Sequence, residues 1–145
     1  MSEIDAISGG RFSKSAKWRI KLMTLTHQYA CILCNGPQET GHHLCLGCPF
    51  AQATWSIVTS CEGINLQPAL QTPSNSLVDW WESASLSIPK EKRRDFNGMA
   101  IYTMWNLWKE RNRRTFDNKY STATQVAERT KEDIEQYRRA FATAY

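Results

Sequence analysis

Four residues within 18 positions have the side chains and the spacing of a metal site. Cys31 and Cys34 form a C-x2-C pair, His43 follows after eight residues, and Cys48 follows after four more. Two cysteines separated by two residues can present both thiolates to one ion from a tight turn, and Asn35-Gly36 supplies a residue suited to a positive φ there. Three thiolates and one imidazole complete the tetrahedral shell of Zn²⁺, so the pattern predicts one structural zinc ion.

The third ligand has two candidates in the sequence. His43 gives spacings of eight and four residues, whereas His42 gives seven and five, and only one of them can turn inward if Leu44 also packs. We favour His43, with His42 either solvated or hydrogen-bonded to a ligand. Cys45, in a Leu-Cys-Leu run, and Cys61 are predicted to be ordinary thiols.

The elements that must position these residues are predicted to be mostly helices. Segment 31–48 is too polar and turn-rich for a long helix, but Pro49 suits the first turn of a helix that starts directly behind the cluster. The residues expected on the packed face of that helix follow the helical period: Phe50, Ala53, Thr54, Ile57 and Val58.

Further helices are predicted downstream. A short one begins at the capping-box pattern Ser76-Leu-Val-Asp79 and carries Trp80 and Trp81. A long one follows Pro89, and a last one covers about 122–142, after a break at 118–124. The fold class is therefore mainly α, with a small Cys₃His zinc knuckle followed by a helical C-terminal region.

Composition divides the 145 residues into a flexible arm (1–16), the knuckle with its following helix (17–60), a linker (61–76) and a helical tail (77–145). No apolar run approaches the roughly 20 residues of a membrane span, and the acidic N-terminus does not resemble a secretory signal. Five cysteines in such a chain favour metal or free thiols over disulfides. We expect an intracellular protein, in the nucleus or the cytoplasm.

The net charge of +4 is distributed unevenly. Residues 1–30 carry +3, residues 31–89 carry −4 without a single Lys or Arg, and residues 90–119 carry +5. A surface that binds phosphate must therefore come from the segments that flank the knuckle. The candidate nucleic-acid contacts lie in two clusters: Lys92, Arg93, Arg94, Lys109, Arg111, Arg113 and Arg114.

Several of these motifs together resemble a known family. Cys31-x2-Cys34, Glu39-Thr40-x2-His43-Leu44, Cys48-Pro49-Phe50-Ala51 and Trp55 are similar to the zinc-binding domain attached to reverse transcriptases of plant non-LTR retroelements. The stretch YTMWNLWKERNRRTF (102–116) resembles the tail that follows this domain in plant retroelement-derived proteins. The similarity covers about 27–58 well and 92–140 loosely.

The resemblance implies zinc ligation by the four residues named above and packing around the metal by Leu44, Phe50 and Trp55. Cys45 departs from the family pattern, which usually has a large apolar residue at that place. Only 30 residues precede the first ligand, and no paired-aspartate polymerase motif is present. We therefore expect a derivative that lacks the polymerase domain.

The first functional hypothesis is a zinc-dependent module that binds RNA or single-stranded nucleic acid through basic and aromatic residues. The aromatic candidates fall at helical spacing, which favours the core over base stacking: Trp80, Trp81, Tyr102, Trp105 and Trp108. The alternatives are a zinc-stapled module that docks a protein through its Trp-rich helices, and a non-functional retroelement remnant. No enzyme activity is expected, because the carboxylates are scattered or spaced to pair with bases. We also expect no small-molecule substrate and no membrane partner.

Overall fold

The computed structural model of the chain describes residues 7–8, 11–12, 30–36, 40, 42–64 and 77–143. Within these ranges the chain is mainly helical, as predicted, and the Cys/His segment precedes the helices. The helices are α2 (Pro49–Glu62), α4 (Leu77–Leu86), α5 (Arg93–Asn112) and α6 (Ala123–Thr143). Shorter helical turns cover His43–Gly47, Lys90–Lys92 and Arg113–Asp117.

Two short strands lie within the range expected to be a flexible arm. β1 (Ile7–Ser8) and β2 (Arg11–Phe12) pair antiparallel, with Ile7 opposite Phe12. The rest of 1–16 lies outside the described residues, as does the first part of the 17–60 unit up to residue 29. Of the expected linker 61–76, the first two residues continue α2, and 65–76 are not described.

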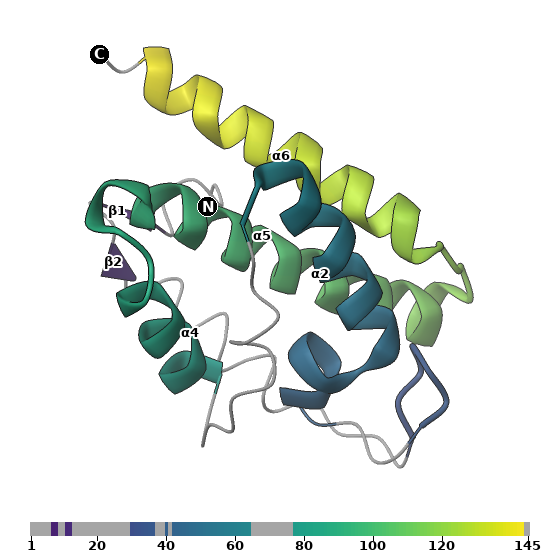
Figure 1. Cartoon of the computed structure of the whole chain (residues 1–145). Coiled ribbons are helices and arrows are strands. Elements are labelled where there is room, and N and C mark those ends of the chain that lie inside the picture. The colour runs from purple at the N-terminus through teal and green to yellow at the C-terminus, as the bar shows by residue number, and fades with distance from the viewer. Residues whose placement is uncertain are drawn as a thin grey trace.

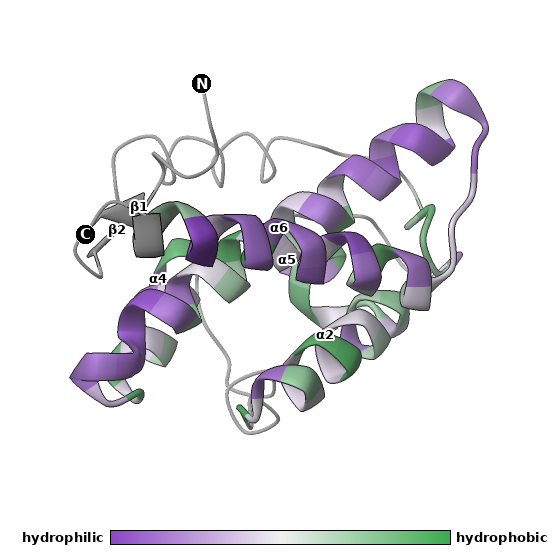
Figure 2. Cartoon of the chain, turned by 90° about the horizontal axis from the view of Figure 1, so that it is seen from above, coloured by the Kyte–Doolittle hydropathy of each residue, from purple (hydrophilic) through white to green (hydrophobic). Residues whose placement is uncertain are grey.

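The helices form two layers around a shared core. α6 lies across α2 and α5, whereas α4 packs against α5 on the side away from α6 (Figure 1). Figure 2 looks down onto α6, whose visible face is mainly hydrophilic. The apolar residues of α6 that are buried underneath include Val126, Ile134 and Tyr137.

Local sequence signals set the helix ends. Pro49 starts α2, and Gly63 ends it with a φ of 66°. α6 begins with a reciprocal capping box, in which the Gln125 N–H donates to Thr122 Oγ1 (3.1 Å) and the Thr122 N–H donates to Gln125 Oε1 (2.8 Å). Arg93 binds carbonyls at and just beyond the end of α4, because its Nε donates to Ser85 O and Ile88 O, both at 3.0 Å.

The packed face of α2 is shifted by about one position from the predicted one. Thr54 and Val58 are buried as predicted, but Ala53 is exposed, and Phe50 and Ile57 are only half-buried. The face that reaches the core consists of Ala51, Thr54, Trp55, Val58 and Thr59. Two threonines can lie on this buried face because each donates its hydroxyl to a carbonyl one turn back in the same helix.

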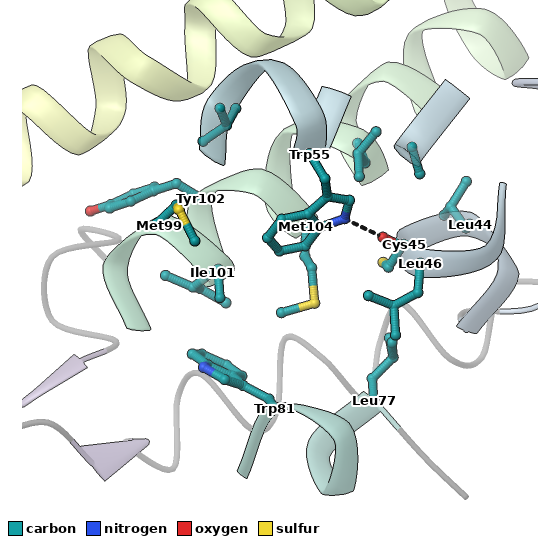
Figure 3. Packing of buried hydrophobic residues seen from close by; sticks show 14 of the residues in the cluster. Leu44, Cys45, Leu46, Trp55, Leu77, Trp81, Met99, Ile101, Tyr102 and Met104 are labelled. Atoms are coloured by element: carbon teal, nitrogen blue, oxygen red, sulfur yellow. Dashed lines mark hydrogen bonds between the residues drawn. The ribbon is translucent and has the colours of Figure 1, made fainter. Parts of the chain in front are cut away.

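Tryptophans of α2 and α4 fill the centre of the molecule, as their helical spacing favours. Trp55 and Trp81 are fully buried, and the Trp80 ring meets the Trp55 ring edge-on at 5.8 Å. In Figure 3, Trp55 lies beside Met104 and points its indole nitrogen at Cys45. That nitrogen donates to the Cys45 carbonyl at 2.7 Å, so the helical core and the Cys/His segment share one hydrogen-bonded interior.

Candidate metal centre

The structure brings the four predicted ligands together. The Sγ atoms of Cys31, Cys34 and Cys48 and one ring nitrogen of His43 all lie within 4.8 Å of one another. The Cys31 and Cys48 sulfurs are 3.8 Å apart, and the Cys34 sulfur is 3.4 Å from His43 Nε2. This group can hold one metal ion, and it includes His43 and not His42.

A tight turn presents the first two cysteines. The Asn35 N–H donates to the Cys31 carbonyl at 2.7 Å, and Asn35 adopts the left-handed conformation with a φ of 57°. Gly36 then passes so close to Cys34 that a Cβ atom there would lie 3.0 Å from the cysteine sulfur. Both residues of the Asn-Gly pair thus shape the turn: Asn35 adopts a positive φ, and Gly36 has no side chain to displace the Cys34 sulfur.

A π-helical turn and the start of α2 present the other two ligands. His43 opens the turn, and its N–H donates to Thr40 Oγ1 at 3.0 Å. Cys48 closes the turn by donating its N–H to the His43 carbonyl at 2.7 Å, and it also caps α2. Thr40 was not among the predicted site residues, although a threonine three positions before a helical turn is a recognisable capping signal.

The two buried sulfurs are electrostatically coupled. The hydrogen bond shared by Cys31 and Cys48 lowers the pKa of Cys31 well below its ordinary value and raises the pKa of Cys48. Cys45 lies beside the site but belongs to the core, where burial raises its pKa to about 12. At neutral pH the Cys45 thiol is therefore protonated, which agrees with its prediction as an ordinary buried thiol.

Arg114 ties the helical tail to the cysteine turn. Its Nη1 donates to the carbonyls of Ile32 (3.1 Å) and Leu33 (3.3 Å), the two residues between Cys31 and Cys34. The guanidinium also lies 4.7 Å from the centre of the Phe50 ring on α2. The Arg114 side chain therefore connects the turn that follows α5 with the start of α2 and with the C-x2-C turn.

Glu110 holds Arg114 in this position. The Glu110 side chain is fully buried and accepts hydrogen bonds from Arg114 Nε (2.9 Å), Arg113 Nε (3.0 Å) and the Ser121 N–H (2.8 Å). Burial acts to raise the pKa of Glu110, but the hydrogen bonds from Ser121 and the two arginines outweigh it and lower the pKa. Neither Glu110 nor Arg114 was predicted to support the metal site, since no local pattern reports a contact 82 residues away.

The predicted basic clusters lie at opposite ends of α5, about 30 Å apart by helical rise. At the first end, Lys92 is exposed, Arg94 is half-buried, and Arg93 binds carbonyls at the end of α4. At the other end, several side chains are engaged within the protein. Their partners are Trp105 for Lys109, Asn112 for Arg111 and Glu110 for Arg113 and Arg114.

The aromatic candidates are mostly interior. Trp80, Trp81 and Tyr102 are buried, and Trp105 and Trp108 are half-buried and stacked on each other at 5.1 Å. None of the described helices is both long and apolar enough to span a bilayer. In comparisons with known proteins, the chain matches no protein-family model, no curated protein and no solved structure.

Proposed function

We propose that this chain is a non-catalytic zinc-binding module, derived from the reverse transcriptase zinc-binding domain that it resembles, which binds single-stranded nucleic acid. The observation that carries the metal part is the convergence of three sulfurs and one imidazole nitrogen within 4.8 Å. Zn–S bonds of about 2.3 Å and Zn–N bonds of about 2.0 Å in a tetrahedron require ligand separations of about 3.8 Å for S···S and about 3.5 Å for S···N. The separations of 3.8 and 3.4 Å match both values.

The donor set favours zinc over magnesium and calcium. Thiolate sulfur and imidazole nitrogen are ligands for Zn²⁺, whereas Mg²⁺ and Ca²⁺ take oxygen ligands. Four protein ligands leave no position for water, so the ion would supply folding energy and no Lewis-acid chemistry. The residues that would hold it are Cys31, Cys34, His43 and Cys48.

The metal part is tested by native mass spectrometry of the reduced, zinc-supplemented protein. We expect one zinc ion per chain in the parent and in His42→Ala, and none in His43→Ala. The His42 variant is the matched control because it removes a neighbouring imidazole outside the ligand group. A parent protein without zinc would leave a decayed retroelement remnant as the better account of the sequence.

The nucleic-acid part is supported by the resemblance and by the excess of positive charge in residues 90–119. Three thiolates on Zn²⁺ leave a net charge of −1, so attraction for phosphate must come from outside the knuckle. The test is the binding of a short fluorescent single-stranded RNA across a salt series. We expect the logarithm of the binding constant to fall linearly and steeply with the logarithm of the salt concentration, whereas binding through apolar contacts would change little.

Docking of a protein partner through Trp80 and Trp81 has no comparable support. Both rings are buried, and the Trp81 indole nitrogen donates to Asn97 Oδ1 inside the core at 3.0 Å. These two rings therefore offer no surface to another protein in the described conformation.

A further inference from the structure

Two exposed aromatic rings lie at the junction of α5 and α6. Among the described residues, the large apolar side chains most open to solvent are Phe116 (74% exposed), Leu86 (72%) and Tyr120 (61%). Phe116 and Tyr120 are four residues apart in the segment that joins the two helices, whereas Leu86 ends α4. Neither ring belongs to the hydrophobic core, so packing in the core does not explain why large aromatic residues stand at these positions.

Each of the two rings has a guanidinium against it. Arg111 Cζ lies 5.9 Å from the centre of the Phe116 ring, and Arg114 Cζ lies 4.9 Å from the centre of the Tyr120 ring. Arg111 and Arg114 are three residues apart, which places them on neighbouring positions of one helical surface. Each of the two exposed rings therefore rests against an arginine, and we call Phe116 and Tyr120 the aromatic platform.

The platform is anchored to the metal centre. The Arg114 guanidinium lies against the rings of both Tyr120 and Phe50. Its Nη1 and Nη2 atoms donate to the carbonyls of the C-x2-C turn and of Ser121, respectively. Only about 10% of the Arg114 side chain is exposed, so this cation acts as a fixed support for Tyr120. The metal site offers no positive charge to a phosphate, but its turn holds Arg114 in place behind the Tyr120 ring. In this way the site can contribute to a binding surface.

The segment that carries the platform has a net charge of +3, and it includes an exposed acid, Asp117, directly after Phe116. Residues 109–120 contain five basic and two acidic residues, and one of the acids, Glu110, is fully buried against arginines. Lys119 is exposed and lies between Phe116 and Tyr120 in the chain. Exposed rings beside cations fit a partner that combines flat aromatic groups with negative charge, which is the chemistry of an unpaired nucleotide strand.

We propose that the aromatic platform stacks unpaired bases of a single-stranded nucleic acid, while Lys119 contacts the adjacent phosphate. This inference rests on the proposed function and gives it a surface different from the two basic clusters at residues 92–94 and 109–114. The arginines at 111 and 114 are assigned to the support of the rings.

The test measures fluorescence anisotropy of a labelled, unstructured RNA of about 12 nucleotides with the zinc-loaded full chain. We expect the double variant Phe116→Ala/Tyr120→Ala to raise the Kd by about tenfold or more, because each base stacked on an aromatic ring contributes strongly. Leu86→Ala is the matched control, since it removes an equally exposed apolar side chain elsewhere, and its Kd should equal that of the parent. Zinc content and circular dichroism of both variants should match the parent.

The phosphate contact has its own matched pair. Lys119→Gln should reduce the slope of log K against log salt by about one, whereas Arg139→Gln, at an exposed cation of α6 outside both basic clusters, should leave it unchanged. Equal binding by the parent and by the platform variants would overturn the platform while leaving the proposed function intact. A parent that binds neither this RNA nor a single-stranded DNA of the same sequence would overturn both, and equally tight binding of a duplex of the same sequence would exclude stacking on unpaired bases.

Discussion

The space beside the Cys34 sulfur leaves little room for a side chain at position 36. A Cβ on Gly36 would lie 3.0 Å from that sulfur, a separation at which the sulfur or the backbone must move by a few tenths of an ångström. At Gly47, a described glycine directly before Cys48, a Cβ would lie 3.5 Å from His43 Nδ1, an ordinary contact distance. A comparison of alanine at these two positions therefore distinguishes a steric requirement of the site from proximity to the site alone.

We expect Gly36→Ala to weaken zinc binding by about tenfold, because displacement of one sulfur distorts a tetrahedron that tolerates only small errors in distance. Gly47→Ala should bind zinc as the parent does. Competition with a chromophoric chelator measures both affinities. Equal affinity for both variants would show that the turn relaxes without moving the sulfur.

At the scale of elements, two arginines bind backbone carbonyls of other segments. Arg93 binds carbonyls at the end of α4, and Arg114 binds those of the cysteine turn. These contacts use the planar guanidinium with its several fixed donors, which lysine does not offer. The two arginines thus perform the same task at different distances from the metal.

Arg114→Lys should lower the free energy of unfolding by about 2 kcal/mol and speed the transfer of zinc to a chelator, because the turn loses donors to two of its carbonyls. Arg93→Lys should lower stability by a similar amount without changing the rate of zinc transfer. Urea denaturation and stopped-flow absorbance measure the two effects. An unchanged transfer rate in Arg114→Lys would contradict the assigned support of the metal site.

Glu110 makes the junction of α5 and α6 sensitive to acid. Its pKa is lowered in the folded chain, so its contribution to stability is present above the unfolded value of about 4.3 and is lost as the pH falls through the folded pKa. We expect Glu110→Gln to cost about 3 kcal/mol at pH 7, since it leaves two partly buried arginines without their counter-charge. The difference between parent and variant should shrink below about pH 4.

Urea denaturation of both proteins from pH 7 to pH 3 checks this expectation, and loss of zinc at low pH largely cancels in the difference. Glu135→Gln is the control, because Glu135 pairs with Arg139 on the exposed face of α6 at 3.5 Å. Its effect should stay below about 0.5 kcal/mol at every pH. A stability difference between the parent and Glu110→Gln that stays constant on acidification would show that the charge of Glu110 is not what matters.

For the whole molecule, the metal segment and the helices share one interior. Buried residues of the Cys/His segment belong to the same cluster as those of α2, α4, α5 and α6. Trp55 joins the two parts through its hydrogen bond to the Cys45 carbonyl. Unfolding of the helices and loss of the metal should therefore occur together.

Zinc removal should lower the Tm of the parent by about 10 °C, the shift expected when a ligand at about 1,000 times its Kd is withdrawn from a chain of this size. Helical circular dichroism and tryptophan fluorescence should change in one transition with and without the metal. In His43→Ala the Tm should not respond to a chelator. Two separate transitions in the parent would mean that the knuckle and the tail are independent units.

Local patterns in the sequence were enough to predict the Cys₃His cluster, the mainly helical fold and the interior position of Trp80 and Trp81. These features depend on spacings of a few residues, which the sequence displays directly. The packed face of α2 was predicted with an error of about one position, partly because Thr59, which reaches the core, hides its polarity by donating its hydroxyl to the Trp55 carbonyl of its own helix. The role of Arg114 depends on a contact between distant segments, and a run of basic residues looks the same whether it binds carbonyls or phosphates.

The contact between Arg114 and Ile32 also has a consequence for the order of folding. The Cys31–Cys48 contact closes a loop of 17 residues, whereas the Arg114–Ile32 contact closes one of 82. The longer closure costs about 1.4 kcal/mol more in chain entropy, so the shorter loop is expected to form first. During refolding, we therefore expect a metal ion to bind the nascent turn before the tail docks, and to stay exchangeable until Arg114 makes its contacts with that turn.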